Sequence, residues 1–236
     1  MKRSFLAVFL IIYSFITYSQ SNVFVLVDVS KSVSQVDLNN AKLTLSEVLI
    51  GTNLSKAFVS QGSQGDLARF NLKQGDRLSI AKFGSLNTTL AINPVQTTIQ
   101  NINADVSLAL GSNNWVPTDN QTYFTLAKAK IAEFAKGNNI FKYKLYIISD
   151  NVNDDFGPGG KPNYPDDYTR NLAEGYNTSS NPISEAGFTK LKFSTSSLFT
   201  LSFSPEVDVS KYSPPGGTPP PVENVASINF MFPSLS

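Results

Sequence analysis

The chain of 236 residues contains no cysteine and no histidine. Without cysteine it can form neither a disulfide nor a lipid-anchored cysteine, so an exported chain of this size would depend on its core alone. The two absences together exclude Ser-His-Asp and Cys-His catalysis, zinc sites built on His or Cys, and haem ligation by His. Any chemistry must therefore come from carboxylates, hydroxyls, amides, Lys, Arg or Tyr.

Charge is also sparse and balanced. Charged residues make up 16% of the chain, with 19 Lys and Arg against 18 Asp and Glu, so no nucleic-acid or other polyanionic partner is indicated. Apolar residues make up 41%, which is enough for a sizeable core. The length suits one α/β domain better than two. We therefore expect a single domain over residues 21–236.

Residues 1–20 predict a secretory signal peptide. Lys2 and Arg3 precede an apolar run over residues 5–18, which small and polar residues follow. The run is shorter than the ~20 residues that span a bilayer, so an uncleaved anchor is the weaker alternative. Cleavage beside Gln20 would leave 17 basic and 18 acidic residues, a net charge of −1. We expect an exported protein (periplasmic, at the cell surface or secreted) that meets the membrane only through this leader.

Two largely apolar segments each end on an aspartate. Residues 23–27 and 144–148 fit strands that are covered on both faces, and they predict adjacent, parallel inner strands of one sheet. A helix is predicted between them, with Ser34 and Asp37 as a capping box, Gly51 at its end, and an apolar stripe of Leu38, Ala41, Leu45, Val48 and Leu49.

The remaining elements are less regular. A hairpin is predicted from strands 76–85 and 87–94. Two amphipathic helices are predicted after it. The first has an apolar stripe of Ile99, Ile102, Val106 and Leu110, and the second, which ends at Gly137, has one of Phe124, Ala127, Ile131 and Phe134. Beyond them we expect a long loop over residues 151–182 with a short helix at 167–173, strands over 198–207 and 225–232, and a Pro-rich connector over 213–223. The order predicts a three-layer α/β/α, doubly wound, mostly parallel sheet with an antiparallel edge strand.

Oxygen-bearing side chains gather at the predicted strand ends. Asp28 and Asp150 converge if their strands are neighbours, and Ser30 and Ser32 can direct both hydroxyls to one side of an extended turn. Carboxylate and hydroxyl oxygens are ligands for a hard divalent cation, so the pattern predicts a site for Mg²⁺, or Mn²⁺ in its place.

The segment Asp28-Val-Ser30-Lys-Ser32, placed after an apolar strand, resembles the Asp-x-Ser-x-Ser signature of the von Willebrand factor A domain. In that family the signature forms a metal-ion-dependent adhesion site. The resemblance, which covers roughly residues 22–203, implies a Rossmann-like fold and two further ligands. These are a threonine before a helix, Thr122 with Thr118 as second choice, and the aspartate Asp150. The family often has Gly where this chain has Asn151.

Each assignment has a simpler alternative. Capping of the first helix could by itself explain the motif of Asp28, Ser30, Ser32 and Ser34. Likewise, Thr122 could be an ordinary N-cap, and Asp150 could be a polar strand end. Three further groups also leave two interpretations open. The loop aspartates could bind Ca²⁺ or form a solvated acidic patch, namely Asp154, Asp155, Asp166 and Asp167. Trp115 and Tyr123 could line the site or pack inside, and the Pro-rich residues 213–223 could be a PxxP ligand or a spacer.

These features favour an exported binding module that is not an enzyme. An ion held by hydroxyls and two carboxylates keeps an open position, which an Asp or Glu of a partner protein can fill; no oligomeric state is predicted. One alternative is a Mg²⁺-dependent hydrolase or phosphatase with Asp28 as nucleophile, although Ser30 stands where haloacid-dehalogenase-like enzymes have a second acid. Another is a scaffold of the same fold without a metal.

Overall fold

The structure of the protein is a computed structural model, and it describes residues 20–52, 68–84, 95–112, 114–155, 188–194 and 199–210. In chain order its elements are β1 (Asn22–Asp28), α2 (Gln35–Ile50), the 3₁₀ turn η1 (Ala68–Phe70), β2 (Arg77–Phe83), β3 (Val95–Thr98), α6 (Ile102–Gly111), α7 (Phe124–Gly137), β4 (Lys142–Ser149), β5 (Thr189–Lys192), β6 (Thr200–Phe203) and β7 (Val207–Asp208). The predictions for the leader before Gln20, the strands 87–94 and 225–232, the helix 167–173, most of the loop 151–182 and the connector 213–223 lie outside the described residues.

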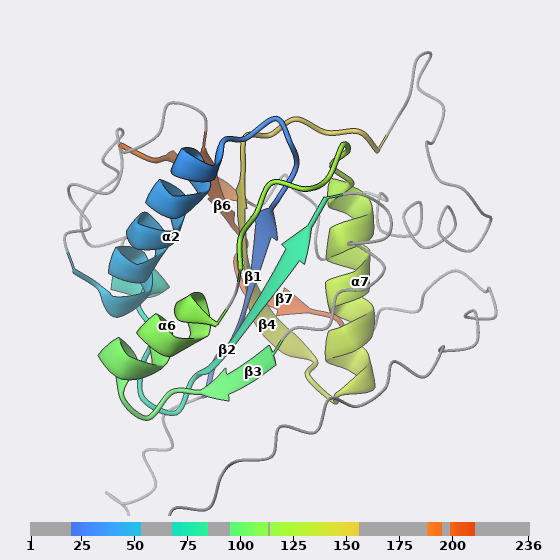
Figure 1. Cartoon of the computed structure of the whole chain (residues 1–236). Helices are drawn as coiled ribbons and strands as arrows, with labels where there is room; N and C mark the ends of the chain where they lie inside the picture. The colour runs from blue at the N-terminus through green and yellow to red at the C-terminus, as the bar shows by residue number, and fades with distance from the viewer. Residues whose placement is uncertain are drawn as a thin grey trace, which may run out of the picture.

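The strands form one open sheet in the order β3-β2-β1-β4-β6-β5, and β7 pairs with β4 at its start. β1 lies at the centre of the parallel part, between β2 and β4 (Figure 1). The register of β1 against β4 runs from Val23 opposite Lys144 to Val27 opposite Ile148. The prediction of two adjacent, parallel inner strands is therefore confirmed.

The sheet is mixed, which corrects the prediction of a mostly parallel one. Only the β1–β2 and β1–β4 pairs are parallel among the described strands, while β3, β6, β5 and β7 each pair antiparallel with a neighbour. The link from β5 to β6 spans residues 193–199, and a parallel neighbour would need a crossover of a dozen or more residues. A hairpin is the arrangement that so short a link allows.

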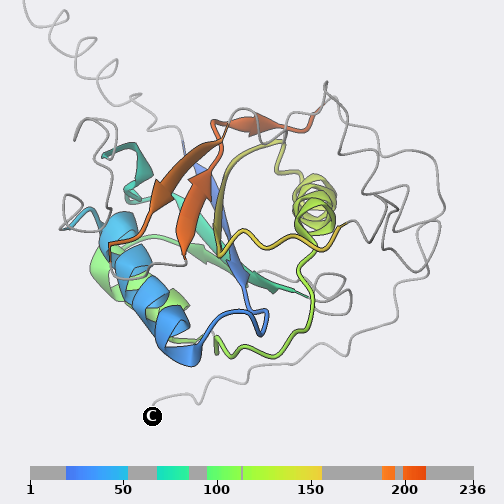
Figure 2. The same cartoon turned by 90° about the horizontal axis from the view of Figure 1, so that it is seen from above.

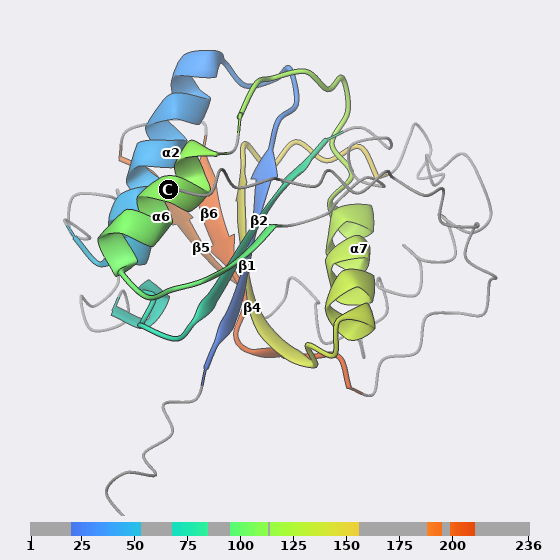
Figure 3. The ribbon, with the colours of Figure 1, turned by 60° about the horizontal axis from the view of Figure 1, so that its bottom comes forward.

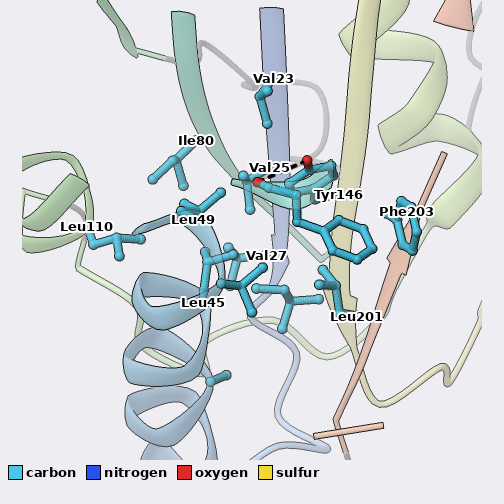
Figure 4. Close-up of a cluster of buried hydrophobic side chains, with 14 of the residues drawn as sticks. Val23, Val25, Val27, Leu45, Leu49, Ile80, Leu110, Tyr146, Leu201 and Phe203 are labelled. Atoms are coloured by element: carbon cyan, nitrogen blue, oxygen red, sulfur yellow. Dashed lines mark hydrogen bonds between the residues drawn. The ribbon is translucent and has the colours of Figure 1, made fainter. Parts of the chain in front are cut away.

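Helices cover both faces of the sheet. Seen from above, α7 lies on one side, and α2 and α6 lie on the other (Figure 2). The odd-numbered valines of β1 enter the core under α2 and α6, while Phe24 and Leu26 enter the core under α7. Figure 4 shows part of the first core, where Leu45 of α2 lies beside Val27 and Leu49 lies nearer Val25. Because β1 is buried on both faces, its sequence shows no alternation.

Local chemistry sets the ends of α2. The Ser34 hydroxyl accepts the Asp37 backbone N–H at 3.1 Å and donates to the Asp37 carboxylate at 2.6 Å, which confirms Ser34 as the N-cap but shows only one of the two backbone bonds of a capping box. At the other end Gly51 adopts φ 87°, in the left-handed region, and its N–H bonds to the carbonyl of Glu47. α2 thus begins and ends at the predicted residues.

Several predicted boundaries differ from the structure. α6 begins at Ile102, so Ile99 is buried in the turn before the helix instead of on its first turn. The antiparallel partner of β2 is β3, which starts after Pro94. The single strand predicted over 198–207 is divided into β6 and β7, and β5 was not predicted. None of the described helices is long and apolar enough to cross a membrane.

Candidate metal centre

Three loops meet at the carboxyl ends of the parallel strands. Residues 29–34 follow β1, residues 114–123 lead into α7, and residues 150–155 follow β4, all at the same end of the sheet (Figures 1 and 3). Backbone bonds tie the first two together, since Thr118 N–H donates to the Val29 carbonyl at 3.0 Å and Lys31 N–H donates to the Asp119 carbonyl at 2.6 Å. Open parallel sheets place their binding sites at this end.

Asp28 is the innermost candidate and has no exposed surface. Its Oδ1 accepts the backbone N–H of Ser30 at 2.9 Å, and its Oδ2 accepts the Ser149 hydroxyl at 2.7 Å. Burial raises the pKa of the carboxyl from the usual 3.8 to about 6. Hydrogen bonds from the Ser149 side chain and from the backbone and side chain of Ser30 oppose the rise, and the nearby Asp150 charge adds to it. Ser149 was not predicted to contribute, because nothing near it in the sequence marks it.

The two serines of the motif lie side by side, with their Oγ atoms 2.7 Å apart. Ser30 is buried and Ser32 is exposed, so the row from Asp28 to Ser32 runs from the core to the surface. Neither hydroxyl caps α2, because the N-cap residue is Ser34. The interpretation of this motif as helix capping alone therefore holds for Ser34 and not for the other three residues.

A second aspartate, absent from the sequence-based set, packs beside the motif. Asp119 is 9% exposed and forms an isolated parallel bridge with Ser30. Its side chain lies against Gly84, the residue after β2, where an added Cβ would lie 2.6 Å from the Asp119 Cβ. Gly84 therefore leaves the space that lets the Asp119 loop reach the strand ends. Thr118, the second choice for the threonine ligand, is exposed in this loop.

Thr122 is 1% exposed, and its hydroxyl has no hydrogen-bond partner among the described residues. The next residue, Tyr123, donates its N–H to the Gly84 carbonyl at 3.2 Å, which places Thr122 beside the end of β2, where Phe83 pairs with Asp28. Tyr123 is the N-cap of α7 and makes no side-chain capping bond. The interpretation of Thr122 as an ordinary N-cap is therefore wrong.

Asp150 follows β4 and is partly exposed. Its Oδ1 accepts the Val152 N–H at 3.0 Å, and its charge is close enough to raise the pKa of Asp28. Asn151 adopts φ 64°, in the left-handed region that Asn tolerates better than most residues with a side chain. The chain therefore turns sharply after Asp150, which leaves this carboxylate at the outer edge of the site.

Asp154 and Asp155 bind the start of α7. Asp154 Oδ2 accepts the Thr122 N–H at 2.7 Å, and Asp155 Oδ2 accepts both the N–H and the hydroxyl of Thr125, at 2.9 and 2.7 Å. Asp155 has no exposed surface, so its assignment to a solvated acidic patch is wrong. Asp155 therefore satisfies an N–H of the first turn that Tyr123 leaves uncapped, and Asp154 holds the residue just before the N-cap.

The aromatic residues beside the site belong to the core. Trp115 is 3% exposed and packs in the cluster under α2 and α6, and Tyr123 is 1% exposed and packs in the cluster under α7. The interpretation of these residues as packing, and not as a ligand-contact rim, is therefore confirmed.

The oxygens fit a small, hard cation. Five predicted ligands contribute three hydroxyls and two carboxylates, one hydroxyl is buried without a partner, and Ser32 and Asp150 lie at the open edge. Within the described ranges no group of three or more Asp or Glu residues could hold a metal ion, so a site of carboxylates alone is not present there. Hydroxyl ligands would have to complete the coordination.

Comparisons with protein-family models, with curated proteins and with solved structures found no match to this chain.

Proposed function

We propose that this protein is an exported binding module that holds Mg²⁺ through Asp28, Ser30, Ser32, Thr122 and Asp150 and presents the ion to an acidic residue of a partner protein. The observation that carries the proposal is the Thr122 hydroxyl, which is buried at the strand ends and has no hydrogen-bond partner among the described residues. A buried hydroxyl without a partner costs about 1–3 kcal/mol, and a cation would satisfy it.

The resemblance to the von Willebrand factor A domain supports the same ligand set. Asp28, Ser30 and Ser32 lie in one row, and the strands that end on Asp28 and Ser149 are parallel neighbours. Asn151 takes the left-handed conformation at the position where that family often has Gly. On this proposal the domain has a doubly wound fold, with helices on both faces of the three parallel strands β1, β2 and β4. The antiparallel strands are then a departure from the family pattern.

The burial pattern supports a binding role. Ser32 and Asp150 lie at the surface end of the row, so the ion would face solvent there and could take a carboxylate from outside. The bound cation would supply positive charge and an open coordination position. A Glu or Asp of the partner would complete both, whereas a Lys or Arg would be repelled.

Burial weighs against the hydrolase alternative. A nucleophilic Asp28 would need an oxygen that a substrate can reach, but this side chain has no exposed surface and both of its oxygens accept hydrogen bonds. A scaffold without a metal is the remaining alternative, because the Asp28 hydrogen bonds need no ion.

Thermal unfolding in Mg²⁺ and in EDTA tests the metal site. At a hundredfold excess over Kd, a cation that binds only the folded state stabilises it by about 2.7 kcal/mol, which raises the melting temperature. Ser32→Ala should abolish the difference between Mg²⁺ and EDTA. Ser34→Ala is the matched control: it removes the α2 cap at a cost of about 1 kcal/mol but should keep the response to Mg²⁺.

Thr122→Val separates the two roles of the threonine. It replaces the unpartnered hydroxyl with a methyl group of similar size, so the protein in EDTA should be as stable as the wild type or more stable. The same change should remove the stabilisation by Mg²⁺. Melting curves of the wild type that coincide in Mg²⁺ and EDTA would reject the metal site and leave the metal-free scaffold.

Binding to immobilised peptides tests the acidic partner. Glu-containing peptides should bind in Mg²⁺ and be released by EDTA, and the same peptides with Gln at each Glu should not bind. Equal binding of both sets would show that carboxylates are not what the site recognises.

A further inference from the structure

The loop after β4 holds Thr122 by a reciprocal pair of hydrogen bonds. Thr122 N–H donates to Asp154 Oδ2 at 2.7 Å, and Asp154 N–H donates to the Thr122 carbonyl at 2.8 Å. Both backbone polar groups of Thr122 are thus bound to one residue. Its hydroxyl is the one polar atom of Thr122 that this pair leaves without a partner.

A second contact in the same loop works one turn further into α7. Asp155 Oδ2 accepts both the N–H and the hydroxyl of Thr125. The two neighbouring aspartates therefore have different structural roles. Asp154 fixes the position of one candidate ligand, and Asp155 satisfies the first turn of the helix.

We infer that Asp154 is a positioning residue that holds the Thr122 hydroxyl at the ion and so sets the affinity of the site for divalent cations. This inference rests on the proposed metal site. The same loop begins with Asp150, so it supplies one ligand and aligns another. Residues that orient metal ligands typically change affinity by 10- to 100-fold when removed.

Mn²⁺ binding to the full chain, measured by calorimetry, tests the inference with three variants. Asp154→Ala should weaken Mn²⁺ binding about 10- to 100-fold. Asp154→Asn should bind nearly as well as the wild type, because the amide oxygen can still accept the Thr122 N–H. Asp155→Ala, the matched control, should lower the melting temperature in EDTA and leave the Mn²⁺ affinity within about threefold.

Amide hydrogen exchange in EDTA provides a readout that needs no metal. Asp154→Ala should speed exchange at Thr122, whereas Asp155→Ala should speed it at Thr125. If Asp154→Ala does not fold, the Asn variant still decides: a loss of affinity there would mean that the Asp154 charge itself binds the ion, which overturns the inference.

The outcomes separate this inference from the proposed function. A wild-type protein that does not bind Mn²⁺ would reject the metal site itself. Wild-type binding that Asp154→Ala leaves unchanged would keep the site and overturn the role of Asp154, as would an equal loss of affinity in Asp155→Ala.

Discussion

Replacing Asp28 with Asn should change how the stability of the metal-free protein depends on pH. The Asp28 carboxyl is buried, and burial raises its pKa from 3.8 to about 6 despite the hydrogen bonds from Ser149 and Ser30. An Asn side chain can keep both contacts, since its oxygen can accept the Ser30 N–H and its NH₂ can donate to the Ser149 oxygen. The substitution therefore removes the ionisation with little change in shape.

The sign follows from the raised pKa. Below about pH 4 the carboxyl is protonated in both states and ionisation does not affect stability. Between about pH 4 and 6 the unfolded chain ionises first, so the free energy of unfolding falls by about 1.4 kcal/mol per pH unit. Above about pH 6 the full loss is reached, and the difference between the two pKa values makes it roughly 3 kcal/mol.

Urea unfolding in EDTA from about pH 4 to pH 8 measures this loss. The Asn variant should gain roughly 3 kcal/mol relative to the wild type across that range, whatever their difference at the acid end. Comparing the two pH profiles cancels any fixed effect of the amide on the hydrogen bonds. Parallel profiles would refute the reasoning, because they would mean that the buried carboxyl titrates as it does in the unfolded chain.

Two neighbours should move the wild-type profile in opposite directions. The Ser149 hydrogen bond lowers the pKa of Asp28, so Ser149→Ala should deepen the loss of stability and extend it to higher pH. The Asp150 charge raises the same pKa, so Asp150→Asn should make the loss smaller. Shifts of the same sign would exclude this account of the Asp28 environment.

Two glycines offer simpler tests by chemical denaturation. Gly84→Ala places a methyl group against the Asp119 side chain, so it should destabilise the protein by about 1–3 kcal/mol and weaken Mn²⁺ binding; an unchanged protein would mean that the loop moves freely. Gly51→Ala combines a left-handed φ of 87° with a Cβ only 2.7 Å from Asn71 Cγ, so it should destabilise by more than Gly75→Ala, where φ is 93° and nothing lies within 4 Å. Equal losses at the two sites would show that backbone strain alone decides.

Some of this structure is visible in local sequence patterns. The apolar run of β1 predicts a strand covered on both faces, and Ser34 and Gly51 predict the ends of α2, because each effect acts within a few residues. The row Asp28, Ser30, Ser32 follows in the same way, since alternate residues of an extended turn point to one side. These predictions needed no knowledge of distant neighbours.

The parts that could not be predicted arise from contacts between distant segments. Gly84 and Asp119 are 35 positions apart, and neither is marked by its neighbours. Asp154 and Asp155 resemble a loop of polar residues, but Asp155 binds the first turn of α7 and Asp154 binds Thr122 just before that helix, 30 and 32 positions earlier in the chain. One signal was present: Tyr123 is a poor N-cap, so the backbone N–H groups at the start of α7 need hydrogen-bond acceptors from another part of the chain.

The hydrogen bond between Asp28 and Ser149 joins residues 121 positions apart, and this separation bears on how the chain is made. A ribosome adds about 5–20 residues per second, so roughly ten seconds pass between the two residues. β2 is completed sooner and can pair with one edge of β1, but the edge that β4 will cover stays open. An open apolar strand edge is a template for pairing with other chains. The segment that carries Asp28 therefore needs shielding in the nascent chain until β4 is made.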